Sequence, residues 1–336
     1  MLRILQNTHI DFIRLRRVAA VVILAFILPA VAWIAISGFR YSIEFTGGTL
    51  MQLEFVKAPS VGDVRSAISD AGLGAVEIQT FGAPNELVVR AQEEQAVAAQ
   101  ARGAESIAGR IRAALDQRFG ANSYRVVRAE AVGPRVGGEL RRNALIAMLI
   151  SFGATLLYLA WRFEWRLAVA AVLANVHDIL ATLAFMKYAS IEITLFVVGG
   201  ILTVIGYSLA DKVVVFDRVR ELLRNRTRIP LYDTLNQAVN ETLPRTVMTG
   251  STVLACLLAL IIFGGSVLRP FAWVLLFGIV VGTFSSIYVA GPLLLWIERK
   301  YPRHAAAGGS HAAPPARDGR ARAQAVTRSD AVSSTR

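Results

Sequence analysis

The stretch of sequence that decides the fold is ITLFVVGGILTVIGYSLADKVVVF, residues 193–216. Its charged side chains are Asp211 and Lys212, which stand near its end. About 20 mostly apolar residues are enough for a helix to cross the roughly 30 Å hydrocarbon core of a bilayer. Because no water reaches that core, a single spanning segment must pair its backbone N–H and C=O groups internally, as a helix does. The stretch therefore predicts a transmembrane helix.

Five further windows have the same apolar character, and with the first they predict six transmembrane helices. They cover residues 18–37, 143–160, 167–186, 245–263 and 271–297. The composition agrees, since 18% of the 336 residues are charged, against about 25% in soluble domains. We expect the first window to be retained, because it is longer than the apolar part of a signal peptide and no small-residue cleavage site follows. The single cysteine excludes a disulfide framework and a cysteine-ligated zinc site.

The basic residues predict that both termini face the cytoplasm, because cytoplasmic flanks carry an excess of Lys and Arg. The cytoplasmic parts are residues 1–17, a loop at 217–244 and a tail at 298–336, all rich in arginine. The short links on the opposite side hold Lys187 and Arg269. We expect the tail to be disordered, because it is poor in large apolar residues. Contact with anionic lipid headgroups accounts for the net charge of +12 without a nucleic-acid partner.

Residues 38–140 lie between the first two windows, and therefore on the periplasmic side of a cell inner membrane. Their charges nearly cancel, as in an ordinary soluble domain. The patterns predict helices at 60–71 and 93–119, a turn at 82–85, and strands at 49–56, 76–81, 87–91 and 124–132. Ser60, with Asp63 three residues later, resembles a capping box. The order β-α-β-β-α-β predicts a ferredoxin-like α+β domain, a fold that by itself indicates no activity.

Polar residues stand near the middle of the helix predicted at 167–186. Asn175, Asp178 and Thr182 are spaced three and four residues apart, so they form one polar stripe. His177 is expected about 100° away from Asp178 around the helix and need not share its partner. An ionisable side chain at this depth is costly and often marks an ion or proton pathway. The alternative is structural: Asp178 ties this helix to a neighbour through hydrogen bonds.

The stretch quoted first contains a second polar group. Thr203, Tyr207 and Asp211 are stacked at a spacing of four, with Ser208 adjacent. A carboxylate that is kept from water near an arginine can take up and release protons, so Asp211 is the main candidate for a proton relay. In the alternative, Asp211 reaches cytoplasmic water at the end of the helix. Lys212 is expected to extend its ammonium group to that water.

The helix at 245–263 supplies a candidate partner for Asp211. Arg245, Thr249 and Thr252 share one of its faces. Because this helix runs antiparallel to the preceding one, Arg245 and Asp211 are expected at similar depth, where they can pair directly or through water. The alternative is that Arg245 is an ordinary anchor at the cytoplasmic surface.

Other patterns indicate helix packing. Gly278 and Gly282 have the small-x-x-x-small spacing of closely packed membrane helices, and Ser285 and Ser286 continue the run of small residues. The sequence has no phosphate-binding glycine-rich loop, no metal-ligand spacing and no nucleophile elbow. We therefore expect no enzymatic activity, no cofactor and no bound metal.

Several motifs, within about residues 10–300, resemble the SecD/SecF family of protein-export membrane proteins. FTGG at 45–48 is similar to the Phe-x-Gly-Gly signature of that family, and VGPRVGGEL at 132–140 is similar to its second signature. Residues 206–221 and the pair Arg245-Thr246 are also similar. The residues that carry the likeness are Phe45, Gly47, Gly48, Gly133, Pro134, Gly206, Asp211, Asp217, Arg218 and Arg245.

The resemblance implies one half of a twelve-helix assembly of the RND superfamily, in which a subunit with a single external domain pairs with the larger SecD. It also implies association with the SecYEG channel and the translocating preprotein, with the SecA ATPase on the other membrane face. Proton-motive force, with H+ as coupling ion, then moves the external domains. Asp211 and Arg245 match positions implicated in proton conduction, and Asp178 lies in another family motif. Where the family often has Asn, this chain has Ala210, which removes a polar neighbour of Asp211.

Two other functions are weighed against this one. A small-molecule exporter of the same superfamily would have a much longer chain with both halves fused. A membrane scaffold that stabilises its partner without carrying protons would tolerate neutral residues at Asp211 and Arg245.

Overall fold

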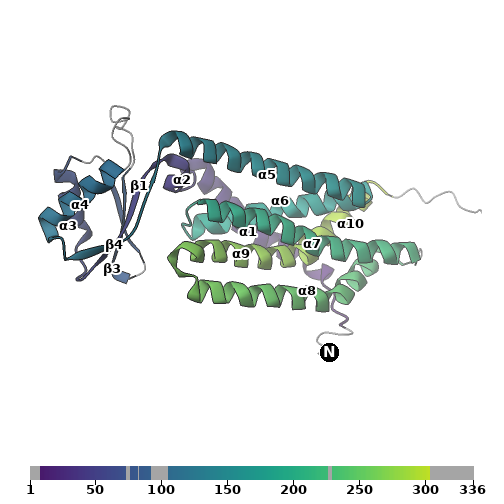
Figure 1. Ribbon diagram of the computed structural model, residues 1–336. Helices are drawn as coiled ribbons and strands as arrows, with labels where there is room; N and C mark the ends of the chain where they lie inside the picture. The colour runs from purple at the N-terminus through teal and green to yellow at the C-terminus, as the bar shows by residue number, and fades with distance from the viewer. Residues whose placement is uncertain (1–7, 73–75, 82, 92–104, 226–228, 303–336) are drawn as a thin grey trace, which may run out of the picture. The chain divides into compact units, whose positions relative to one another are not determined.

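The computed structural model describes residues 8–72, 76–81, 83–91, 105–225 and 229–302. The chain divides into two compact units, Met1–Ile297 and Glu298–Arg336. The sheet and the helices labelled in Figure 1 belong to the first unit, apart from the end of the last helix. Most of the tail expected to be disordered, residues 303–336, lies outside the described residues.

Six helical runs in the described residues are long and apolar enough to cross a membrane, which confirms the predicted fold class. Figure 1 shows α5 to α9 running alongside one another. Buried Leu159, Phe216, Leu235 and Leu294 belong to one apolar core that joins several of these helices. Five of the runs are α1 (Arg16–Ser37, preceded by a 3-10 turn at Ile13–Leu15), α5 (Pro134–Arg162), α6 (Trp165–Tyr188), α7 (Leu195–Asn225) and α8 (Leu231–Phe263). The sixth run contains α9 (Gly265–Ser285) and α10 (Gly291–Lys300).

The region predicted as a cytoplasmic loop, 217–244, is mostly helical. α7 continues to Asn225 and α8 already begins at Leu231, while residues 226–228 lie outside the described part. Buried apolar side chains recur here at helical spacing, so both helix ends pack on the core of the bundle. These side chains are Val219, Leu222, Leu235, Ala238 and Val239. The loop prediction was wrong because the charged residues between them concealed this apolar face.

Two other helix boundaries differ from the prediction. α5 begins at Pro134, ahead of the apolar window at 143, because proline is well suited to the first turn of a helix. The last predicted helix, 271–297, is interrupted by a π-helical turn at Ser286–Ala290, between α9 and α10. Single π turns inside α-helices are uncommon and are often found at functional sites.

The domain between the first two membrane helices has the predicted ferredoxin-like order. Its elements are β1 (Gly48–Phe55), α3 (Val61–Asp70), β2 (Val76–Phe81), β3 (Ala83–Ala91), α4 (Glu105–Phe119) and β4 (Tyr124–Val132). The strands form one antiparallel sheet in the order β2-β3-β1-β4. Figure 1 shows α3 and α4 on the same side of this sheet.

Alternation along β1 explains how the sheet divides its two faces. Met51, Leu53 and Phe55 point into the core formed with α3 and α4, whereas Leu50 and Gln52 point to the other face. Ser60 caps α3 as predicted, because its hydroxyl accepts the backbone N–H of Asp63 at 3.0 Å.

The hairpin and the second helix of this domain differ in part from the prediction. The hairpin is tighter than the turn at 82–85 suggested, since Ala83 and Asn85 already belong to β3. The Asn85 amide donates to the Phe55 carbonyl oxygen at 2.9 Å, which fixes the start of β3 next to the end of β1. The first part of the helix predicted at 93–119 falls outside the described residues.

Candidate functional site

Asp211 lies inside the helix bundle and is held by hydroxyl groups from two other elements. The Asp211 residue as a whole is 9% exposed. One carboxylate oxygen accepts the Thr246 hydroxyl of α8 at 2.7 Å, and the other accepts the Ser286 hydroxyl at 2.7 Å. Each oxygen therefore has a partner from a different helix. This placement disagrees with the alternative in which Asp211 reaches water at the end of α7.

Ser286, which donates to Asp211, is the first residue of the π turn. Its hydroxyl lies between the Asp211 carboxylate and the Thr283 carbonyl oxygen, which is 2.8 Å away. Single π turns in α-helices are often found at functional sites, and this one begins at the residue whose hydroxyl meets Asp211. Sequence reasoning placed Ser286 among the packing residues and Thr246 in a motif, without a role at Asp211. A serine that continues a row of small residues in an apolar helix was the available signal.

Lys212 is buried, which corrects the expectation that it reaches water. The Lys212 residue as a whole is 0% exposed. The ammonium group contacts a carboxylate oxygen of Asp178 in α6 and the hydroxyl of Ser208 one turn earlier in α7. Asp211 and Lys212 are neighbours in sequence but point to different helices, because successive residues are about 100° apart around a helix. A buried charge is tolerated when an opposite charge and hydrogen bonds compensate it, and Asp178 and Ser208 supply both.

Asp178 is the centre of this second cluster. One of its carboxylate oxygens accepts from both Lys212 and Ser208, and the other lies 2.9 Å from Nδ1 of His177. His177 therefore contacts Asp178 itself, although the two residues are about 100° apart around α6. Thr182 donates to the backbone oxygen of Asp178 at 2.7 Å, away from the carboxylate. The contacts tie α6 to α7, which is the structural role weighed for Asp178, and they also connect it to a buried cation.

Some buried polar atoms next to these clusters have no hydrogen-bond partner within the described residues. They include both amide atoms of Asn175, Nε2 of His177 and the hydroxyl of Ser285. Asn175 is one turn from Asp178 along α6. Ser285 is one turn from Gly282, where an added Cβ would lie 2.9 Å from Cβ of Ser208. Because buried polar atoms in proteins are nearly always hydrogen-bonded, these atoms mark positions where water would find partners.

Close packing of α9 on α7 holds the two clusters together. A Cβ at Gly278 would lie 2.3 Å from a Val204 methyl, and one at Gly282 would meet Ser208. The small-x-x-x-small spacing therefore has the packing role expected of it. Only glycine at these two positions lets α9 approach α7 closely enough for Ser286 to reach Asp211.

Arg245 does not pair with Asp211 directly. Its side chain is exposed, and no hydrogen bond or ion pair joins the two residues in the part of the chain that the structure describes. The next residue, Thr246, occupies the position that faces Asp211. Arg245 instead lines an open cavity of about 900 Å³ together with Asp11 and Asn240. A link between Arg245 and Asp211 through water stays a prediction.

The other residues of the predicted site lie outside the two clusters. Thr203 and Thr249 are exposed, and their hydroxyls donate to carbonyl oxygens of their own helices at 2.8 and 2.9 Å. Tyr207 is half-buried, and its hydroxyl lies 3.9 Å from a Cβ placed on Gly250 of α8. Asp217 pairs with Arg162 of α5 at 2.7 Å. Arg218 pairs with Glu221 and Glu241, so this end of α7 is linked to α5 and α8.

The family-like motifs pack against each other where the sheet domain joins the bundle. Phe45 lies in α2 (Ile43–Thr46) and is buried with Ala144 and Val198. Gly47 and Gly48 follow with φ of 76° and 124°, a backbone region that favours glycine. A Cβ on Gly137, in the first turns of α5, would lie 2.9 Å from the backbone nitrogen of Gly47. Gly133 and Pro134 start α5 at this contact.

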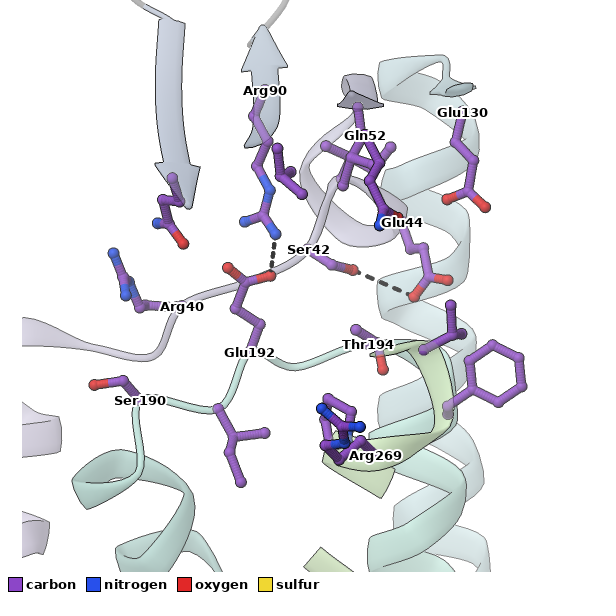
Figure 2. A pocket seen from close by; sticks show the side chains of 18 of the residues that line it. Arg40, Ser42, Glu44, Gln52, Arg90, Glu130, Ser190, Glu192, Thr194 and Arg269 are labelled. Carbon is purple, nitrogen blue, oxygen red and sulfur yellow. Dashed lines mark hydrogen bonds and ion pairs between the residues drawn. The ribbon is translucent and has the colours of Figure 1, made fainter. Parts of the chain in front are cut away.

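A second cavity, of about 400 Å³, lies between the free face of the sheet and the link from α6 to α7 (Figure 2). Arg90 of β3 forms an ion pair with Glu192 of this link. The Glu44 carboxylate accepts the Ser42 hydroxyl at 3.2 Å and the backbone N–H of Leu195, the first residue of α7, at 2.6 Å. A carboxylate at a helix N-terminus is favoured by the helix dipole. Sequence reasoning missed Glu44, Arg90 and Glu192, because their spacing along the chain gives no sign of these contacts.

Comparisons with known proteins agree with the motifs. The family model described as protein export membrane protein SecD/SecF, C-terminal, matches residues 113–300, and the SecD/SecF GG motif matches residues 32–59. The protein translocase subunit SecF of Gemmatimonas aurantiaca is 54% identical over 90% of this chain and 91% of its own length. The protein of the same name from Desulfurispirillum indicum is 42% identical over 88% and 94%.

Solved structures show the same likeness. The crystal structure of SecDF, a translocon-associated membrane protein from Thermus thermophilus, superimposes with a TM-score of 0.77 at 33% identity and covers 89% of this chain. SecDF in its super-membrane-facing form gives a TM-score of 0.63 at 32% identity over 88% of this chain. The present chain spans 40% of each of those longer chains.

Proposed function

Because the chain belongs to the SecD/SecF family of protein export membrane proteins, we propose that it is the subunit that works with SecD to promote preprotein export. The pair uses the proton-motive force to draw preproteins across the cytoplasmic membrane through SecYEG, while SecA acts on the cytoplasmic face. The chain itself catalyses no reaction. Its two termini face the cytoplasm and its sheet domain faces the periplasm, in keeping with the distribution of Lys and Arg.

The observation that carries the proposal is the carboxylate of Asp211 within the helix bundle. A group that gains and loses a proton there changes the charge that Thr246 and Ser286 stabilise. When Asp211 is neutral, its oxygens attract these hydroxyls less strongly, since hydrogen bonds to charged groups are the stronger ones. The packing of α7 against α8 and the π turn is then biased between two arrangements, as a proton-driven motion requires.

The outer end of α7 offers a route from Asp211 to the sheet domain. α7 begins at Leu195, whose backbone N–H is bound by Glu44 of α2. α2 leads directly into β1, a central strand of the sheet. A rotation or shift of α7 would therefore be passed to the sheet through Glu44 and through the pair Arg90–Glu192. The sheet domain is then the part that acts on the preprotein.

An exposed row on α7 and α8 supports SecD as the partner in the membrane. Thr203, Gly206 and Ala210 are exposed on α7, and Arg245 and Thr249 are exposed on α8. An arginine is a poor neighbour for lipid, whereas small residues allow another helix to approach closely. The crystallised SecDF chain is longer than this one, which spans 40% of it, so it has room for a second half. Arg245 would then lie at a boundary between subunits, near enough to Asp211 for water to join them.

Replacing Asp211 by asparagine tests the proposal. We expect Asp211→Asn to abolish the part of preprotein export that depends on the proton-motive force, because the amide cannot carry the charge change. The control is Asp233→Asn, which neutralises an exposed carboxylate in the first turn of α8 and should export normally. Co-purification with SecD establishes that both variants assemble. Undiminished export by assembled Asp211→Asn would refute the relay and leave the scaffold role.

A further inference from the structure

The ammonium group of Lys212 is surrounded by oxygen atoms. Within the described residues its hydrogen-bond partners are a carboxylate oxygen of Asp178, the Ser208 hydroxyl and, at 3.5 Å, the Ser208 carbonyl oxygen. The side chains of Lys212 and Asp178 are 0% and 1% exposed. A charged, a hydroxyl and a carbonyl oxygen thus meet at one point between α6 and α7. The cation at this point is the Lys212 ammonium group, a side chain of the protein itself.

Such a set of oxygen donors is also what a small hard cation requires. Carboxylate, carbonyl and hydroxyl oxygens are the ligands that hard metal ions prefer. The lysine ammonium is a compact point charge on a flexible stem, so it can fill a position of this kind and supply three hydrogen-bond donors. While it is there, the Asp178 carboxylate is neutralised and a second cation would be repelled.

We propose that Lys212 determines ion specificity: its ammonium group permanently occupies a cation position at Asp178 and Ser208, so that Na+ cannot bind there and coupling is confined to protons at Asp211. The inference rests on the proposed function in that it concerns which ion drives export. It names Na+ as the ion class that the lysine excludes. Lys212 acts here as a positioning residue, since it fixes Asp178 without carrying the transported ion.

The surroundings of the cluster fit this role. Nδ1 of His177 lies against the second carboxylate oxygen of Asp178, so both oxygens are occupied while the lysine is present. If the lysine were replaced by a neutral residue, the carboxylate would be left without its positive partner. Two groups buried without partners in the described part of the chain lie near these elements: Asn175 is one turn from Asp178 along α6, and Ser285 is one turn from Gly282, which packs on Ser208.

The first test measures ion binding by thermal stability, independently of export. The full chain is purified in detergent and melted at one alkaline pH in NaCl or in choline chloride of equal ionic strength. Wild type should melt at the same temperature in both salts. Lys212→Met, which removes the charge at similar volume, should melt about 3 °C or more higher in NaCl, because binding of Na+ to the native state stabilises it. Lys212→Gln provides a second neutral variant if the methionine protein does not fold.

The matched control removes both charges. The double variant Asp178→Asn with Lys212→Met has no carboxylate left at the ammonium position to attract Na+, so its melting temperature should not depend on the salt. Na+-dependent stabilisation of wild type, or its absence from folded Lys212→Met and Lys212→Gln, would overturn the inference. A salt response of the double variant equal to that of the single variants would also overturn it, because the response would not come from Asp178.

The second test measures the driving ion in inverted membrane vesicles that contain the chain with SecD. Wild-type export should follow an imposed pH gradient and ignore a Na+ gradient of the same size. Wild-type export driven by the Na+ gradient would refute the inference. Failure of any ion gradient to stimulate wild-type export would refute the proposed function instead, and the melting comparison would still decide whether Lys212 excludes Na+.

Discussion

At the scale of single residues, Gly137 of the second family motif is explained by how closely α5 approaches the start of β1. The backbone nitrogen of Gly47 lies where a side chain at Gly137 would project. Gly138, the next residue, would meet nothing within 4 Å if it carried a Cβ. Adjacent glycines in one helix therefore serve different purposes. One is required by contact with another backbone, and the other is not.

Alanine substitutions at these two positions should have opposite effects on stability. Both gain up to about 1 kcal/mol of helix propensity, but Gly137→Ala must also displace backbone atoms, an overpacking that costs about 1–3 kcal/mol. We expect the melting temperature of the full chain to fall for Gly137→Ala and to stay level or rise for Gly138→Ala. Equal melting temperatures for the two variants would contradict the close contact between α5 and Gly47.

At the scale of elements, Asp211 joins α7 to α8 through the hydroxyl of Thr246. A hydrogen bond to a charged group contributes about 1.5–3 kcal/mol, and Thr246→Val removes it with little change of volume. We expect this variant to lose stability by that amount and to show weaker export driven by the proton-motive force. Thr155→Val is the control, because the Thr155 hydroxyl donates to Ser151 of its own helix, so its loss should change stability by less than about 0.5 kcal/mol. Equal losses in the two variants would show that Thr246 does not support Asp211.

The elements of this fold differ in how well they can be predicted from the sequence. The membrane helices and the β-α-β-β-α-β order could be predicted because long apolar runs and alternation are local properties. The π turn at Ser286–Ala290 could not, since no residue type specifies it. Burial of Lys212 was missed because sequence gives the depth of a residue but not the helix it faces. Ser208, four residues earlier, and Asp178 on the neighbouring helix were the signals that, taken together, pointed inward.

The extension of α7 and α8 beyond the apolar runs illustrates the same limit. Arg218 and Glu221 suggest a loop when hydropathy is averaged over a window. The Arg218 side chain pairs with Glu221 and with Glu241, on the face away from the core. In this part of α7 the buried apolar residues are Val219 and Leu222, which are too few to dominate the average.

At the scale of the whole molecule, the sheet domain is tied to the membrane helices by a small number of polar contacts. Arg90 and Glu192, with side chains 17% and 18% exposed, form one of them beside the cavity of Figure 2. A surface ion pair stabilises a protein by about 0–1 kcal/mol, and removing one partner of a fully buried pair destabilises it by about 3–5 kcal/mol. For this partly buried pair we expect an effect between the two. Loss of this tie would leave the bond from Glu44 to the start of α7 and the contact of Phe45 with Ala144 and Val198.

A double-mutant cycle on Arg90 and Glu192 tests whether this tie carries motion from the bundle to the sheet. We expect Arg90→Gln and Glu192→Gln each to reduce export several-fold while Asp211 and its partners stay intact, because a shift of α7 would no longer be passed on fully. The double variant should be no worse than either single one, since the interaction is already lost. The exchanged pair Arg90→Glu with Glu192→Arg should recover part of the activity. Additive losses in the double variant, or no recovery in the exchanged pair, would mean that the two residues act separately, and the route from Asp211 to the sheet would then run through Glu44 and β1.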